Sequence, residues 1–187
     1  MKKSIIIILI IVIAVVIAIG WLVGFYNNLV AQEKAIEGQW AQVENQYQRR
    51  FDLIPNLVNS VKGMMKQEQE VFGKITEART RYAGARTLEE KVGATNQVEG
   101  ALARLLVIME NYPELKSAEN VQTLMIQLEG TENRISVERG RFNDRVREYN
   151  IRITQFPGNV LAPLFGFSAK EFFGATEGAE VAPRVEL

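Results

Sequence analysis

The stretch IIIILIIVIAVVIAIGWLVGF, residues 5–25, decides the architecture of this chain, because it holds no charged residue and a long charged sequence follows it. An α-helix rises 1.5 Å per residue, so about 20 apolar residues cross a hydrocarbon core roughly 30 Å thick. The run therefore predicts one transmembrane helix at the N-terminus.

A cleaved signal peptide is the alternative interpretation of the same run. Lys2 and Lys3 would form its positive region, and residues 18–20 would form a small-residue cleavage site. However, the apolar stretch continues past that site, and Trp21 and Tyr26 lie where an interfacial aromatic belt is expected. These features favour an uncleaved anchor.

The distribution of positive charge predicts the orientation of the anchor. Lys2, Lys3 and the terminal amine precede the run, whereas the fifteen residues after Phe25 contain only Lys34. The positive-inside rule then places the N-terminus in the cytoplasm. We expect a single-pass protein of the cell (inner) membrane with its bulk domain outside the cytoplasm.

Composition excludes several kinds of chemistry. The chain has no cysteine and no histidine, which excludes disulfides, thiolate chemistry, the usual zinc sites and imidazole catalysis. Lysine plus arginine equals aspartate plus glutamate, so no bulk charge attracts nucleic acid. One domain-sized sequence remains after the anchor.

A seven-residue apolar series near the C-terminal end predicts helix packed against helix. Its members are Val121, Leu128, Ile135, Phe142, Tyr149 and Phe156, and the companion series four residues on is Met125, Glu132, Arg139, Val146 and Ile153. The seam is thus apolar at both ends and ionic in its middle. Each of the two charges should therefore have a partner on a neighbouring helix.

Two further helices are predicted upstream. One starts at the membrane, with the seam Leu29, Ile36, Val43, Arg50 and Leu57 and the companions Trp40, Tyr47, Ile54 and Val61. Pro55 interrupts it, and the seam keeps its phase there, which favours a kinked helix over a new start. A shorter helix is expected over residues 88–111, with Thr87 at its start and Pro113 after its end.

Short breaks between long amphipathic helices indicate an antiparallel bundle. The predicted fold is all-α, an N-terminal transmembrane helix running into an antiparallel bundle of long helices. The expected parts are a cytoplasmic N-terminus (1–4), the transmembrane helix (5–25), the bundle domain (26–173) and a flexible C-terminal tail (174–187).

Several ordered motifs resemble the LemA family of bacterial membrane proteins. They are YNNLV (26–30), RRFDLIPNLV (49–58), YPELK (112–116) and TENRI (131–135), followed by FN (142–143), YN (149–150) and FP (156–157). The resemblance runs from the anchor to about Phe173. It implies a single N-terminal membrane helix and a bundle of long helices, with no established enzymatic activity.

The charged seam positions form the first candidate site. Arg49, Arg50 and Asp52 lie mid-helix, as do Glu132 and Arg139, and antiparallel packing would bring the two sets together. We interpret these five residues as a structural polar cluster that fixes helix register, which is the best-attested role of buried polar groups. A partner-binding or catalytic cluster is the alternative.

A second candidate is an arginine stripe on the last long helix. Arg134, Arg141, Arg145 and Arg152 follow one another by seven, four and seven residues and would suit an anionic lipid or an acidic partner. Glu138 and Glu148 lie within one turn of most of them, so local ion pairs are the favoured interpretation.

Acidic residues give no clear metal or catalytic site. Glu129 and Glu132 share one helical face, but a di-iron bundle needs histidines that this chain lacks. Most of the other acids lie beside basic residues, which is typical of a solvated helix face. We expect no cofactor, no metal and no enzymatic activity.

An aromatic segment follows residues 156–158, with Leu161, Leu164, Phe165, Phe167, Phe172 and Phe173 close together. Folding back over the bundle end is the favoured interpretation, and docking on a membrane or on another subunit is the alternative.

These patterns predict a non-enzymatic, membrane-anchored scaffold or adaptor of the bacterial cell envelope. Its expected partners are the membrane, other envelope proteins and further copies of the chain. The alternative function is a membrane-surface or lipid-binding module that uses the arginine stripe and the aromatic segment.

Overall fold

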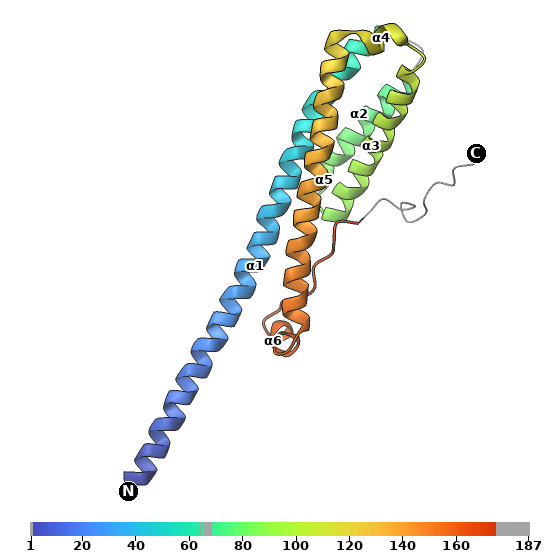
Figure 1. The fold of residues 1–187 in the computed structure, drawn as a ribbon. Coiled ribbons are helices and arrows are strands. Elements are labelled where there is room, and N and C mark those ends of the chain that lie inside the picture. Colours follow the sequence, from blue (N-terminus) through green and yellow to red (C-terminus); the bar gives the residue numbers. More distant parts are fainter. Residues whose placement is uncertain (1, 64, 66–68, 175–187) are drawn as a thin grey trace, which may run out of the picture. The chain divides into compact units, whose positions relative to one another are not determined.

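The structure, a computed structural model, describes residues 2–63, 65 and 69–174. Helices are the only regular elements in this part of the chain, which confirms the expected all-α fold (Figure 1). They are α1 (Lys2–Lys62), α2 (Gln69–Gly84), α3 (Leu88–Met109), α4 (Pro113–Ser117), α5 (Glu119–Thr154) and α6 (Gly158–Leu164). The expected flexible tail lies outside the described residues except for Gly174.

The chain divides into two compact units, and both α1 and α5 contribute to each. We call residues 1–41 and 140–172 the anchor unit, and residues 42–139 and 173–187 the network unit.

In the anchor unit, α1 changes from exposed to buried near residue 25. The side chains from Ile5 to Val23 are mostly exposed, whereas Phe25, Leu29 and Ile36 are buried. Among the described residues, α1 is the only helix long and apolar enough to cross a membrane. The membrane-type sequence therefore passes into the packed helix without an intervening loop.

The second part of α5 covers this buried face. Phe142, Val146, Tyr149 and Ile153 are buried, as the seven-residue seam predicts. Trp40 meets Phe142 with ring centroids 5.5 Å apart, and Arg152 lies over the ring of Phe25 at 5.7 Å. Trp40 of α1 contacts Phe142 of α5, whereas the earlier residue Phe25 contacts the later residue Arg152. The two helices therefore run antiparallel here.

Phe156, the last member of the predicted seam, is not buried. Phe156 was expected to continue the buried series, but 84% of its surface is exposed. The reason is that α5 ends at Thr154, so the helical phase that would direct Phe156 inward is lost before that residue.

In the network unit, α1 continues through Pro55 to Lys62, as the unbroken seam indicated. α2 and α3 pack against each other, and Phe51 of α1 meets Tyr82 of α2 with ring centroids 4.5 Å apart. The largest fully buried side chains here are Tyr47, Ile54, Leu57, Met65, Ile75, Leu105, Met109, Leu115 and Ile135.

The ends of α3 follow from local sequence. Thr87 forms a capping box with Glu90, in which each side chain accepts a hydrogen bond from the other residue's main chain. The helix ends at Met109, two residues before the expected end, and Tyr112 takes an extended φ of −124° ahead of Pro113. The expected break is occupied by the short helix α4, and α5 begins at Glu119.

Candidate functional site

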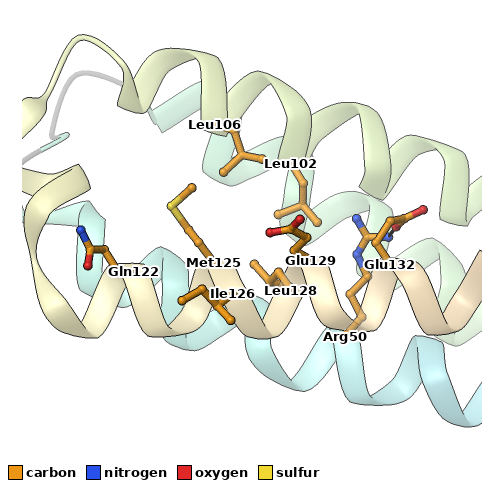
Figure 2. Close-up of a pocket in the computed structure, with 9 residues that line it drawn as sticks. All are labelled: Arg50, Leu102, Leu106, Gln122, Met125, Ile126, Leu128, Glu129 and Glu132. Carbon is orange, nitrogen blue, oxygen red and sulfur yellow. Dashed lines mark hydrogen bonds and ion pairs between the residues drawn. The ribbon is translucent and has the colours of Figure 1, made fainter.

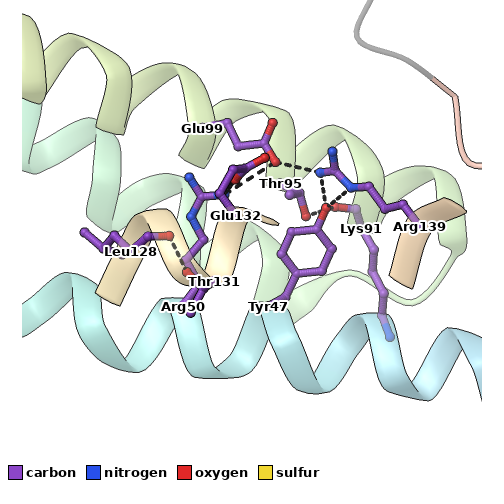
Figure 3. A network of polar contacts seen from close by, with 9 residues as sticks. All are labelled: Tyr47, Arg50, Lys91, Thr95, Glu99, Leu128, Thr131, Glu132 and Arg139. Atoms are coloured by element: carbon purple, nitrogen blue, oxygen red, sulfur yellow. Dashed lines mark hydrogen bonds and ion pairs between the residues drawn. The ribbon is translucent and has the colours of Figure 1, made fainter. Parts of the chain in front are cut away.

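An ion network links three helices of the network unit. Arg50 of α1 pairs with Glu132 of α5, and its Nη1 atom lies 3.7 Å from Oε1 of Glu99 on α3. Arg139 of α5 donates to the same Glu99 oxygen at 2.6 Å. Figure 3 shows Glu99 between the two arginines. We call Arg50, Glu99, Glu132, Arg139 and Tyr47 the ion network.

Tyr47 connects the network to the aromatic core of the unit. The Nε atom of Arg139 donates to the Tyr47 hydroxyl at 2.7 Å, and the guanidinium also lies over the Tyr47 ring. Burial raises the pKa of Tyr47 above its ordinary value, although Arg139 opposes that shift. Tyr47 therefore stays neutral and accepts from Arg139 at neutral pH.

The network is partly shielded from water, with the Glu132 side chain 42% exposed, and its charges balance. Arg50 is buried, while Glu99 and Arg139 are each about a fifth to a quarter exposed. Burial disfavours the charge on Arg139, but Tyr47 and Glu99 outweigh it and raise its pKa. Two arginines face two glutamates, so each ion is stabilised by its neighbours.

Phe173 covers one side of the network. Its ring centroid lies 4.5 Å from the guanidinium carbon of Arg139, and its side chain is buried. A cation–π contact of this kind stabilises a partly desolvated arginine. The end of the aromatic segment therefore shields the ionic layer.

The other two residues of the predicted cluster lie outside the network. Arg49 is exposed, and Asp52 is exposed and accepts a hydrogen bond from Gln48 at 2.9 Å. Both follow from helical geometry, because positions next to Arg50 and Phe51 point about 100° away from the packed face. The structure thus brings together Arg50, Glu132 and Arg139 of the five.

An apolar groove adjoins the network (Figure 2). It has a volume of about 590 Å³ and is lined by α3 and α5, with Arg50 at one end. Its apolar lining residues are Leu102, Leu106, Met125, Ile126 and Leu128, and its polar ones are Arg50, Gln122, Glu129 and Glu132. Ile126 and Leu106 are exposed, so the groove opens to the surface.

Glu129 lies on the groove without an ion-pair partner among the described residues, whereas Glu132 is paired with Arg50. No group of three or more metal-binding side chains occurs in the described part of the chain. The geometry therefore provides an apolar surface with one available carboxylate.

The arginines of the predicted stripe differ in their surroundings. Arg134, in the network unit, is exposed. In the anchor unit, Arg145 pairs with Glu148 at 3.2 Å and Arg152 lies over the Phe25 ring, while Arg141 also has an interaction partner.

Comparison with known proteins gives the family. The LemA family profile matches residues 39–187, which include the ion network and the groove. The chain belongs to the LemA family.

Relatives of this LemA-family protein include magnetosome proteins. MamQ 1 and MamQ 2 of Paramagnetospirillum magneticum are each 28% identical over 174 aligned positions, and MamQ of Magnetospirillum gryphiswaldense is 27% identical. Each alignment covers 79% of this chain and 64% of the MamQ protein. The LemA-family chain thus matches somewhat less than two thirds of their length.

Sequence reasoning missed two members of the ion network in this LemA-family chain. Glu99 lies seven residues after Val92 and seven before Leu106, at a seam position of α3. A charge at a seam position is the signal that would have identified it. The seven-residue pattern places Tyr47 among the apolar companions, whereas its hydroxyl makes it part of the network.

Proposed function

We propose that this LemA-family protein is a non-enzymatic, membrane-anchored scaffold or adaptor of the cell envelope, and that its groove binds a helix of another envelope protein. The groove beside the ion network is the observation that carries this proposal. An exposed apolar surface on a helical domain is typical of a protein interaction site.

The shape of the groove favours a helix as its occupant. The lining residues on α5 are Gln122, Met125, Ile126, Glu129 and Glu132, spaced by three and four residues, so they form one helical face. Leu102 and Leu106 form the matching face on α3. A third helix laid between them would complete a bundle and bury both faces.

The negative charge of Glu129 indicates which side chains the partner helix should carry. Glu129 offers an unpaired carboxylate beside the apolar lining, so a lysine or arginine next to the apolar face of the partner would pair with it. We therefore expect an amphipathic partner helix with a basic residue at the edge of its apolar face.

The role of the ion network supports a scaffold rather than a catalyst. Its arginines and glutamates are engaged with one another, and its charges fix α1, α3 and α5 in one register behind the groove. The relatives are named as magnetosome proteins, and that name assigns no reaction to this chain. The proposed location is the inner membrane, with the bundle outside the cytoplasm.

Photocrosslinking in cells tests the proposed function. A photoreactive amino acid at Ile126 lies in the groove, whereas one at Val107 of α3 lies outside its lining. The two positions are matched in exposure, at 69% and 65%. We expect a defined protein adduct from position 126 and a much weaker one from position 107.

The sequence of the crosslinked segment and the dependence of the adduct on Glu129 provide the control. Mass spectrometry of the adduct should identify an amphipathic segment with a basic residue, and Glu129→Lys should abolish the adduct while Glu129→Gln weakens it. Equal adducts from both positions, or an adduct insensitive to Glu129→Lys, would contradict the proposal. An adduct to a second copy of the chain would assign the groove to self-assembly instead.

A further inference from the structure

The anchor unit contains a second apolar feature besides the membrane span. Residues 155–169 include no aspartate, glutamate, lysine or arginine, and Arg152 and Lys170 flank this stretch. We call it the uncharged segment. It contains α6 and the aromatic residues after it.

The short helix α6 has one face toward the protein and one away from it. Gly158 and Ala162 are buried, and they lie four residues apart on the same side. Val160 and Leu164 lie on the opposite side, with exposures of 54% and 75%. Phe156, just before the helix, is 84% exposed, so three apolar side chains of this segment are left uncovered by the described residues.

Contacts with α1 fix the level of this surface along the membrane span. The ring of Tyr26 meets Phe165 at a centroid distance of 5.3 Å and Phe167 at 5.6 Å. Because residues 5–25 have the length of a hydrocarbon core, Tyr26 falls at its boundary. A bilayer centred on residues 5–25 would therefore have its headgroups at the level of the uncharged segment.

Both ends of the segment are attached to the anchor unit. At its start, Gly158 approaches the main chain of Arg152 so closely that an added Cβ would overlap the carbonyl oxygen. At its end, the Asn150 side chain exchanges two hydrogen bonds with the main chain of Lys170, at 2.8 and 2.9 Å. Lys170 also pairs with Glu33. These contacts hold α6 in place.

We propose that the uncharged segment is a second membrane contact, in which Phe156, Val160 and Leu164 insert into the interface of the leaflet where α1 leaves the bilayer. An exposed apolar helix face at headgroup depth is the arrangement that interfacial helices use. Arg152 is exposed beside this segment and suits the headgroup region, where basic side chains meet anionic lipid. Tyr26, at the expected aromatic belt, contacts Phe165 and Phe167 of the same segment.

Depth-dependent fluorescence quenching tests the proposal in the full-length protein. The natural chain has no cysteine, so single substitutions Val160→Cys and Leu164→Cys can each carry one environment-sensitive fluorophore. The labelled protein is reconstituted at a low protein-to-lipid ratio into vesicles with and without nitroxide-labelled lipid. Ile19→Cys, within the span, serves as the positive control.

Ala41→Cys is the matched negative control, because Ala41 is exposed and lies on α1 about 22 Å beyond Tyr26. We expect lipid quenching at positions 160 and 164 to be several-fold stronger than at position 41 and close to that at position 19. Quenching equal to that at position 41 would overturn the proposal. A blue-shifted but unquenched fluorophore would also overturn it, because protein would then cover the surface.

A third label guards against local disruption of α6. Phe156→Cys places the fluorophore before the helix begins, and circular dichroism checks that helical content is unchanged. Strong lipid quenching there supports the proposal, and weak quenching at all three positions overturns it.

Discussion

Arg50 is the residue at which three helices of the network unit meet. Its guanidinium faces Glu132 of α5 and Glu99 of α3, and its own side chain is buried. Removing it would leave Glu132 without its ion-pair partner, whereas Glu99 would keep Arg139, and an unpaired charge in a partly shielded site is costly.

We expect Arg50→Ala to lower the free energy of unfolding by about 2 kcal/mol, less than for a fully buried pair because Glu132 keeps part of its exposure to water. Thermal unfolding followed by circular dichroism in detergent measures the change. The neighbouring Arg49→Ala is the control, and it should change stability by no more than about 0.5 kcal/mol, as at exposed positions generally. Equal effects of the two substitutions would refute a stabilising role for Arg50.

Exchanging the charges of Arg50 and Glu132 should restore only part of the stability. The new carboxylate at position 50 would face Glu99, which lies within 4 Å of the present guanidinium. Full restoration by the double exchange would mean that Glu99 does not act on the charge at position 50.

Tyr82 gives the network unit a specific alkaline response. Burial, aided by Glu44, raises the pKa of Tyr82 to about 12. The unfolded chain releases this proton near pH 10 and the folded chain near pH 12. The stabilisation is therefore complete below pH 10 and is lost as the pH rises from 10 to 12.

Tyr82→Phe should reduce the fall in melting temperature between pH 9.5 and 11.5, with little change at pH 7, because the ring contact with Phe51 remains. Tyr47, whose pKa is also raised, should leave a residual slope. Identical alkaline slopes in the two proteins would show that Tyr82 is not the group that titrates.

At the scale of the elements, the junction between α5 and α6 depends on one glycine. A Cβ at Gly158 would overlap the main-chain oxygen of Arg152, and main chain cannot give way as a flexible side chain does. By contrast, a Cβ at Gly140, within α5, would meet nothing within 4 Å.

Gly158→Ala should lower the free energy of unfolding by about 1 to 3 kcal/mol, as overpacking does, and displace α6. Gly140→Ala should raise it by about 0.5 to 1 kcal/mol, because alanine favours helix more than glycine does. Melting temperatures of the two variants in the same detergent provide the comparison. Destabilisation by both would point to a general intolerance of larger residues rather than to this junction.

The elements also show what the sequence reveals and what it does not. The heptad series located α1 and α5, because packed faces repeat every seven residues, and Thr87 located the start of α3. The prediction that Phe156 is buried was wrong, because a seven-residue repeat does not show where a helix ends. The prediction that Arg49 and Asp52 join the polar cluster was wrong. They are close to Arg50 in sequence, but neighbouring residues of a helix point in different directions, so both side chains face away from the packed side.

At the scale of the whole molecule, the charges around the span predict the topology of the protein. If the bundle lies outside the cytoplasm, a single cysteine at exposed Thr123 should react with a membrane-impermeant maleimide in intact cells. A cysteine introduced at Ser4, before the span, should react only after the cells are lysed. The reverse pattern would place the bundle in the cytoplasm.

The passage of α1 from lipid into the anchor unit has a consequence for where this protein resides. Phe25 is already packed beneath Arg152, so no slack in the chain separates the apolar span from the folded domain. A bilayer thicker or thinner than the span must then be matched by tilting the domain or by deforming the lipid around it, at a cost of fractions of a kcal/mol per Å. Such a penalty sorts proteins among membranes of different thickness, so we expect the length of residues 5–25 to bias the protein towards bilayers of matching thickness.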